Sequence, residues 1–173
     1  MSVREVVIFP DDRLREPTHD VTSFDDELSK LAADMFDTMY DDEGIGLAAP
    51  QIGDHRRIVV IDIPDDQDRQ HINPLVLVNP VVVSHSDKQV ESDEGCLSVP
   101  GYQGKITRYE TCSVEYQDLK GNHLKIENAT GLLAICLQHE IDHLSGRLFI
   151  DYLSRLKREM LLKKYTKLQK NRG

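Results

Sequence analysis

The sequence has no long apolar run. No uninterrupted hydrophobic stretch among its 173 residues approaches the ~20 residues that a helix needs to cross a bilayer, so we expect no transmembrane segment and no membrane partner. Residues 1–10 have no basic start followed by a long apolar core, and they are not rich in arginine and serine. We therefore expect neither a signal peptide nor an organelle transit peptide.

Cysteine is scarce as well. The three cysteines are an odd number with no paired spacing, which argues against a disulfide framework. Reduced cysteines without an export signal predict a cytoplasmic protein. At 173 residues the chain has the size of one domain, and a chain of this size buries about 70% of its unfolded surface, enough for an ordinary core.

Positive charge is sparse outside the C-terminal segment, and the formal net charge is −9. Residues 155–173 hold 8 Lys or Arg and 1 Glu, a local charge of +7, whereas residues 1–154 hold 13 basic and 29 acidic residues, a local charge of −16. The acidic body argues against nucleic-acid binding by that part, and we expect no specific DNA partner. We therefore expect one domain over residues 1–173, with a basic helix or tail over about 154–173.

The most informative feature present is an H-E-x-x-H pattern at His139–His143, inside an apolar, helix-like segment over Thr130–Leu144. His139 and His143 are one helical turn apart, so both imidazoles project from one face and can bind one metal ion. Glu140 can then reach a metal-bound water without ligating the metal. The pattern predicts a metal-dependent hydrolase.

A catalytic site for a tetrahedral metal needs a third protein ligand and one open position. Downstream, Phe149 occupies the place where one zinc-protease pattern has a histidine, and Glu159 lies among lysines and arginines, where a surface ion pair explains it better. Upstream, Cys96 lies in a glycine-containing turn and is a good soft ligand. Cys136 shares the helical face of His139, but its apolar neighbours favour a buried apolar role. The sequence favours Cys96 over Cys136 without excluding the latter.

Helical and strand-like segments follow one another along the chain. Ser23 can cap a first helix that has an acidic first turn and ends near Asp41–Gly44. Pro80 interrupts a valine-rich segment, which predicts an edge strand or a bulge. The order of helix, several strands, buried helix and terminal helix predicts an α+β fold. The other expected elements are strands over Arg57–Ile63 and Leu75–Val83 around a polar loop at Pro64–Pro74, strands over Cys112–Gln117 and His123–Glu127 around a turn at Lys120–Asn122, the helix over Thr130–Leu144, and a final helix after Asp151.

A third cluster, Gly44–Gln51, contains alternating glycines that let a backbone approach its neighbours closely. Taken alone, it is explained by a turn between a helix and a strand. Taken with the other two clusters, it resembles the peptide deformylase family, whose three motifs are G-φ-G-φ-A-A-x-Q, E-G-C-φ-S and H-E-φ-D-H, where φ is apolar. Residues 44–51, 94–98 and 139–143 match all three in the family's order, and the resemblance covers nearly the whole chain.

The resemblance implies an enzyme that removes the formyl group from the N-terminal formylmethionine of newly synthesised proteins. It also implies a fold in which short antiparallel sheets wrap around the buried metal-binding helix, followed by a C-terminal helix. A metal bound by Cys96, His139 and His143 would lower the pKa of its water from about 15.7 toward about 7, and the resulting hydroxide would attack the formyl carbonyl. Glu140 would act as general acid and base.

The resemblance also assigns the remaining site residues. The Gln51 side-chain amide and the Leu97 backbone N–H would stabilise the developing oxyanion, and one such donor is typically worth ~3 kcal/mol. One region departs from the family, because many relatives carry an arginine shortly after the proline that corresponds to Pro100, whereas this chain continues Gly101–Lys105 without one. Contacts beyond the first substrate residue are therefore not carried over. The residues that match the methionine pocket and the peptide-binding backbone are Ile45, Gly46, Gly95, Leu132, Ile135 and Cys136.

One cysteine and two histidines suit Zn²⁺, Fe²⁺, Co²⁺ or Ni²⁺, and the resemblance implies Fe²⁺ in the cell. Two alternatives stay open, a metallopeptidase that cleaves internally and a non-catalytic member of the fold with a structural metal. A structural site would need a fourth protein ligand, and the sequence offers no evident one. The partners implied are nascent formylmethionyl peptides and the ribosome near its exit tunnel, bound through a basic helix on which Lys163, Lys167 and Lys170 share one face.

Overall fold

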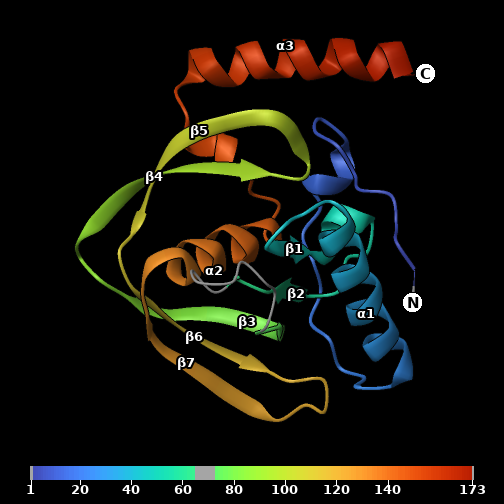
Figure 1. The fold of residues 1–173 in the computed structure, drawn as a ribbon, viewed down its shortest axis with the longest axis vertical. Coiled ribbons are helices and arrows are strands. Elements are labelled where there is room, and N and C mark those ends of the chain that lie inside the picture. The colour runs from blue at the N-terminus through green and yellow to red at the C-terminus, as the bar shows by residue number, and fades with distance from the viewer. Residues whose placement is uncertain (1, 65–72, 173) are drawn as a thin grey trace.

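Figure 1 shows the computed structural model of the chain, which describes residues 2–64 and 73–172. This part of the chain folds into two antiparallel sheets and three α-helices. The polar loop expected over Pro64–Pro74 falls mostly on residues 65–72, outside the described residues.

Every neighbouring pair of strands in both sheets is antiparallel. The larger sheet has the order β1-β2-β3-β6-β7, and the smaller one pairs β4 with β5. The strands are β1 (Gly46–Ala48), β2 (Ile58–Ile61), β3 (Leu75–His85), β4 (Gln89–Cys96), β5 (Val99–Tyr109), β6 (Cys112–Gln117) and β7 (His123–Ala129).

The helices are α1 (Asp26–Asp41), α2 (Gly131–His143) and α3 (Arg155–Arg172). Helix α2 lies between the larger sheet and the β4–β5 pair, and α3 runs along the outside next to β5 (Figure 1). The expected fold class, an α+β fold with short antiparallel sheets around a buried central helix and a C-terminal helix, is confirmed. No helix in the described ranges is long and apolar enough to cross a membrane.

Helix α1 begins one residue after Asp25, whose extended backbone and side chain cap it. The Asp25 carboxylate accepts a hydrogen bond from the backbone N–H of Leu28 at 3.0 Å. The prediction that Ser23 caps this helix is therefore wrong, because the chain turns into the helix two residues later and the aspartate makes the bond. The apolar stripe of α1 is fully buried and consists of Leu28, Leu31, Met35 and Met39.

Strand β3 contains the bulge that Pro80 predicted. Its register against β6 shifts between Val78 and Val81, and Asn79 adopts a positive φ of 52° there. The Asn79 side chain bonds the Val21 backbone at 2.8 and 2.9 Å, which holds the distorted segment in place. The missing N–H of Pro80 is tolerated at such a bulge, so β3 passes through the middle of the sheet rather than along its edge.

Three of the strands were not predicted from the sequence. Strand β1 was expected to be part of a glycine-rich loop, and β4 and β5 were not expected at all. The segment Gln89–Cys96 is mostly polar and has a single β-branched residue, Val90, whereas β2 and β3 are rich in such residues. The turn expected around Cys96 is confined to Leu97 and Ser98, which connect β4 to β5.

Candidate metal centre and catalytic cleft

Helix α2 presents the H-E-x-x-H residues at the centre of the molecule. His139 and His143 are 8% and 1% exposed, and their ring centroids lie 5.1 Å apart. One helical turn separates them, so both rings project toward the smaller sheet. Burial lowers the pKa of His143 well below its usual value, which keeps the imidazole in the neutral form that a metal requires.

Cys96, at the end of β4, completes a group of three metal-ligating side chains. The candidate ligand atoms of Cys96, His139 and His143 all lie within 4.8 Å of one another, and Cys96 Sγ is 3.4 Å from His143 Nε2. Ligands at 2.0–2.3 Å in a tetrahedral shell are separated by about 3.5 Å, so this spacing fits a metal such as zinc or iron. Cys136 is not in this group, although it was a candidate by sequence alone.

A buried network of charges orients His139. The Glu94 carboxylate accepts a hydrogen bond from His139 Nδ1 at 2.8 Å, which leaves Nε2 for a metal. Arg108 donates to both oxygens of Glu94, at 2.8 and 2.9 Å, and to Asp142 at 2.7 Å. Burial alone would raise the pKa of Glu94, but the hydrogen bonds from Arg108 and His139 outweigh burial and lower it to about 2.

Glu94 and Asp142, which lie inside two of the three sequence motifs, both form ion pairs. Arg108, which joins them, was missed. It sits on β5, and it is 4% exposed although it is a charged residue. Its guanidinium also lies 4.8 Å from the centre of the Tyr152 ring. No local pattern identifies it, because its partners come from another strand and from α2.

Glu140 is buried beside the ligand group. The residue as a whole is 4% exposed, and its Oε2 has no hydrogen-bond partner among the described residues. Burial raises its pKa to about 7, so the carboxylate is poised to exchange a proton near neutral pH. A buried oxygen of this kind, next to three metal-ligating atoms, fits a site that holds a metal and a water.

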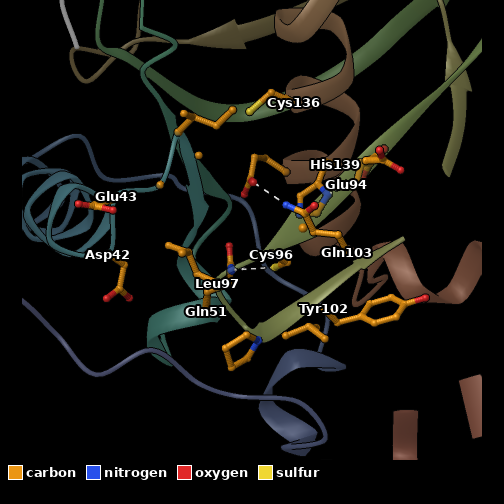
Figure 2. A pocket seen from close by; sticks show the side chains of 18 of the residues that line it. Asp42, Glu43, Gln51, Glu94, Cys96, Leu97, Tyr102, Gln103, Cys136 and His139 are labelled. Atoms are coloured by element: carbon orange, nitrogen blue, oxygen red, sulfur yellow. Dashed lines mark hydrogen bonds and ion pairs between the residues drawn. The ribbon is translucent and has the colours of Figure 1, made fainter. Parts of the chain in front are cut away.

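Gln51 approaches the centre from the other side, in the short helical turn after β1. Its Oε1 accepts the backbone N–H of Ala48 at 2.9 Å, which fixes the orientation of the amide. The amide nitrogen therefore faces Ser98 Oγ at 3.1 Å and Cys96 Sγ at 3.3 Å. Leu97 follows Cys96 in the turn between β4 and β5, so both expected oxyanion donors lie beside the ligand group (Figure 2).

Cys96, His139, Glu140, Gln51 and Leu97 line a cleft of about 1090 Å³. Every residue expected to hold the methionine or the peptide backbone also lines it, so the structure brings the predicted site together in one place. At Gly46 a Cβ would lie 2.9 Å from both Cys136 Sγ and Glu140 Oε1, so only glycine lets β1 pass this close to Glu140. The residues expected to hold the methionine or the peptide backbone, all of which line the cleft, are Ile45, Gly46, Gly95, Leu132, Ile135 and Cys136.

Comparison with known proteins agrees with this arrangement. Residues 3–159 match the family model described as polypeptide deformylase. The chain belongs to the peptide deformylase family. It is therefore an enzyme of a metal-dependent family, and Cys96, His139 and His143 are its possible metal site.

Members of this family match the chain over nearly its whole length. The chain is 49% identical over 173 residues to a peptide deformylase of Brucella suis biovar 1 (strain 1330), covering 100% of this chain and 97% of the relative. The solved peptide deformylase of Ehrlichia chaffeensis in complex with actinonin has a TM-score of 0.90 at 44% identity, over 96% of this chain and 98% of that one. A peptide deformylase structure from Legionella pneumophila has a TM-score of 0.86 at 47% identity, over 97% and 98%.

Proposed function

We propose that this protein removes the formyl group from the N-terminal formylmethionine of newly synthesised proteins and releases formate. The observation that carries the proposal is the ligand group of Cys96, His139 and His143 at a cleft that Glu140 and Gln51 also line. Family membership supports the same reaction. A purely structural metal site would need a fourth protein ligand, and none lies in the ligand group of the described residues.

A divalent metal held by these three side chains would acidify a bound water and polarise the formyl oxygen. The donor set of one thiolate and two imidazoles suits Fe²⁺, Zn²⁺, Ni²⁺ and Co²⁺, and we propose Fe²⁺ as the metal in the cell. The thiolate ligand and ferrous iron are both open to oxidation, so anaerobic purification is the appropriate preparation.

Glu140 takes the proton of the attacking water and later delivers it to the leaving amine. Its burial and its raised pKa of about 7 suit both directions of transfer. The Gln51 amide and the Leu97 backbone N–H donate to the oxygen that becomes negative during attack. The Gln51 amide is held in place by Ala48 and Ser98 before substrate arrives, which is the preorganisation that such donors need.

The methionine side chain enters the apolar part of the cleft. Cys136 is 6% exposed, and burial, with the nearby carboxylates, raises the pKa of its thiol well above the usual value. It is therefore a neutral wall residue rather than a second thiolate ligand. The peptide backbone lies in extended form between Gly46 and Gly95, which come from strands of the two different sheets.

The decisive experiment assays formyl-Met-Ala and an unformylated peptide of similar length with one anaerobic preparation of known metal content. It measures formate release and peptide-bond cleavage. Formate release from the first and no cleavage of the second supports deformylation. Cleavage of internal peptide bonds without formate release would instead favour the metallopeptidase alternative.

We further propose that the protein works in the cytoplasm, where nascent chains emerge, and that α3 brings it to the ribosome near the exit tunnel. The eight basic residues in 155–173 fit a phosphate-rich surface. Leu161 and Tyr165 anchor α3 to the body, being 6% and 2% exposed, and Tyr165 donates a hydrogen bond to the Pro100 carbonyl. Lys163, Lys167 and Lys170 are exposed on its surface.

A further inference from the structure

One wall of the catalytic cleft is a bulge at the start of β5. The neighbouring β4 residues Gly95 and Cys96 pair with Gln103 and Val99 of β5. In the register of the described strands, the three residues between these partners, 100–102, therefore face no residue of β4. All three line the cleft, and we call them the 100–102 bulge. A bulge interrupts the ladder of backbone hydrogen bonds, so contacts from outside β4 must hold this wall in place.

Helix α3 contacts the first residue of the bulge. Pro100 has no backbone N–H, so its carbonyl is its one backbone hydrogen-bonding group. This carbonyl accepts the hydrogen bond from the Tyr165 hydroxyl. Burial, and after it the neighbouring Tyr102, raises the pKa of Tyr165 above its usual value, so the hydroxyl stays protonated at neutral pH and can donate. One hydrogen bond thus connects α3 to the wall of the cleft.

The Tyr165 ring is itself held by packing. It is buried in a core cluster that also contains Leu161 and Phe149. Its ring meets the Phe9 ring edge to face, with the centroids 6.0 Å apart and an interplanar angle of 72°. The ring therefore anchors α3, and the hydroxyl at its tip is placed against the bulge. Ring and hydroxyl have separate contacts, so a substitution can remove one and keep the other.

The last residue of the bulge is held by stacking. The Tyr102 ring lies 6.2 Å from the Phe149 ring, at an interplanar angle of 28°. Figure 2 shows this ring directed away from Gln51. It also covers Gly104, where an added Cβ would lie 3.1 Å from Tyr102 Cε1. The bulge is thus fixed at both ends, and the contact at the Pro100 end comes from α3.

The bulge borders the place proposed for the substrate peptide. Gly95, which is proposed to hold the peptide backbone, pairs with Gln103, the residue that follows the bulge. An added Cβ at Gly95 would lie 3.6 Å from the Tyr102 carbonyl oxygen, which is van der Waals distance. A movement of the bulge would therefore move the wall against which the first residues of the peptide lie.

We propose that Tyr165 is a positioning residue for the substrate peptide, because its hydrogen bond to Pro100 holds the 100–102 bulge in the place that the peptide requires. The proposal rests on the proposed deformylase function and adds a residue of α3 to peptide binding. Tyr165 is not among the described residues that line the cleft, so its effect reaches the peptide through Pro100. A wall that is fixed before the peptide arrives lowers the entropic cost of binding.

The test is Tyr165→Phe, which removes the hydroxyl and keeps the ring. KM and kcat per bound metal are measured with formyl-Met-Ala-Ser on an anaerobic preparation of known metal content. We expect KM to rise about 3- to 10-fold, the effect of one neutral hydrogen bond, with kcat within about twofold. A merely structural role would lower the folded fraction, so the apparent kcat would fall at unchanged KM. That result would overturn the proposal.

Amide hydrogen exchange gives a second readout that does not depend on activity. The N–H groups of Gly101 and Tyr102 should exchange about 3- to 10-fold faster in Tyr165→Phe, whereas those of α2 should exchange at the same rate as in the unaltered protein. Equal exchange of the bulge in both proteins would show that Tyr165 does not hold it.

The matched control is Tyr116→Phe, which removes a hydroxyl from β6, outside the described lining of the cleft. It should keep the KM and the exchange rates of the unaltered protein, and a similar rise of KM in both variants would overturn the role of Tyr165. If the unaltered protein releases formate and Tyr165→Phe has an unchanged KM, the positioning role alone fails. If the unaltered protein releases no formate from any formylated peptide, the proposed function fails and the positioning role fails with it.

Discussion

At the scale of single residues, Glu140 offers the most direct test of the chemistry. Replacing it by alanine or glutamine removes proton transfer but leaves the three ligand atoms in place. We expect kcat to fall by about 10²–10⁴-fold with metal content unchanged. Metal analysis and a formate-release assay on the same sample measure both quantities. Near-normal turnover in a metal-loaded variant would show that another group moves the proton.

The two cysteines of the cleft are proposed to have different roles, Cys96 as a metal ligand and Cys136 as part of the apolar wall. Cys96→Ser removes a thiolate from the ligand group, so bound metal should fall well below one per chain or its preference should shift. Cys136→Ser places a hydroxyl in the apolar wall, so metal should stay and KM should rise. Metal stoichiometry and KM of both variants decide the matter. The reverse pattern would exchange the two assignments.

At the scale of the elements, the β4–β5 pair depends on a charge inside the protein. Arg108→Ala leaves Glu94 buried without its main partner, and losing one member of a buried pair typically costs about 3–5 kcal/mol. Lys88→Ala in the same hairpin removes an exposed pair with Glu110, worth about 0–1 kcal/mol. Urea unfolding of the metal-free variants gives both values. Similar losses for the two would mean that the buried network does not stabilise the hairpin.

The same hairpin shows where sequence patterns stop being informative. Strands β2 and β3 could be predicted from their short runs of Val, Ile and Leu, and helix α2 from its longer apolar run. The pattern of β4 is hidden, since a buried Glu94 takes the place of an apolar residue and is satisfied by Arg108, fourteen positions away. Likewise, the three motifs predicted which residues gather at the centre, but the place of Asp42 and Glu43 at the cleft could be identified only once the fold set the end of α1 beside it.

At the scale of the whole molecule, charge is divided between an acidic body and a basic C-terminal helix. Because Leu161 and Tyr165 belong to a core cluster, deleting α3 would also expose that core. Reversing the charge of exposed lysines on α3 leaves that core covered, so it is the cleaner experiment. Changing Lys163, Lys167 and Lys170 to glutamate should abolish salt-sensitive co-sedimentation with ribosomes and leave hydrolysis of short formylated peptides within about twofold.

A matched control for that experiment reverses three exposed lysines elsewhere, Lys88, Lys120 and Lys125. This variant should still co-sediment at low salt. If both variants bind ribosomes as the unaltered protein does, α3 has no docking role.

The three ligand atoms come from two different elements, Cys96 from the small sheet and the histidines from the central helix. A metal bound there would connect the small sheet to the central helix. The fraction of chains that hold metal and the thermal stability of the protein are therefore linked by mass action. At a free metal concentration 100 times Kd the gain is about 2.7 kcal/mol, or roughly 5–10 °C in Tm for a chain of this size. Calorimetry before and after chelation, with re-addition of Ni²⁺, measures it, and an unchanged Tm would refute it. In a cell short of the metal, such a protein would lose its activity and its resistance to proteases together, so the inactive form would be cleared rather than accumulate.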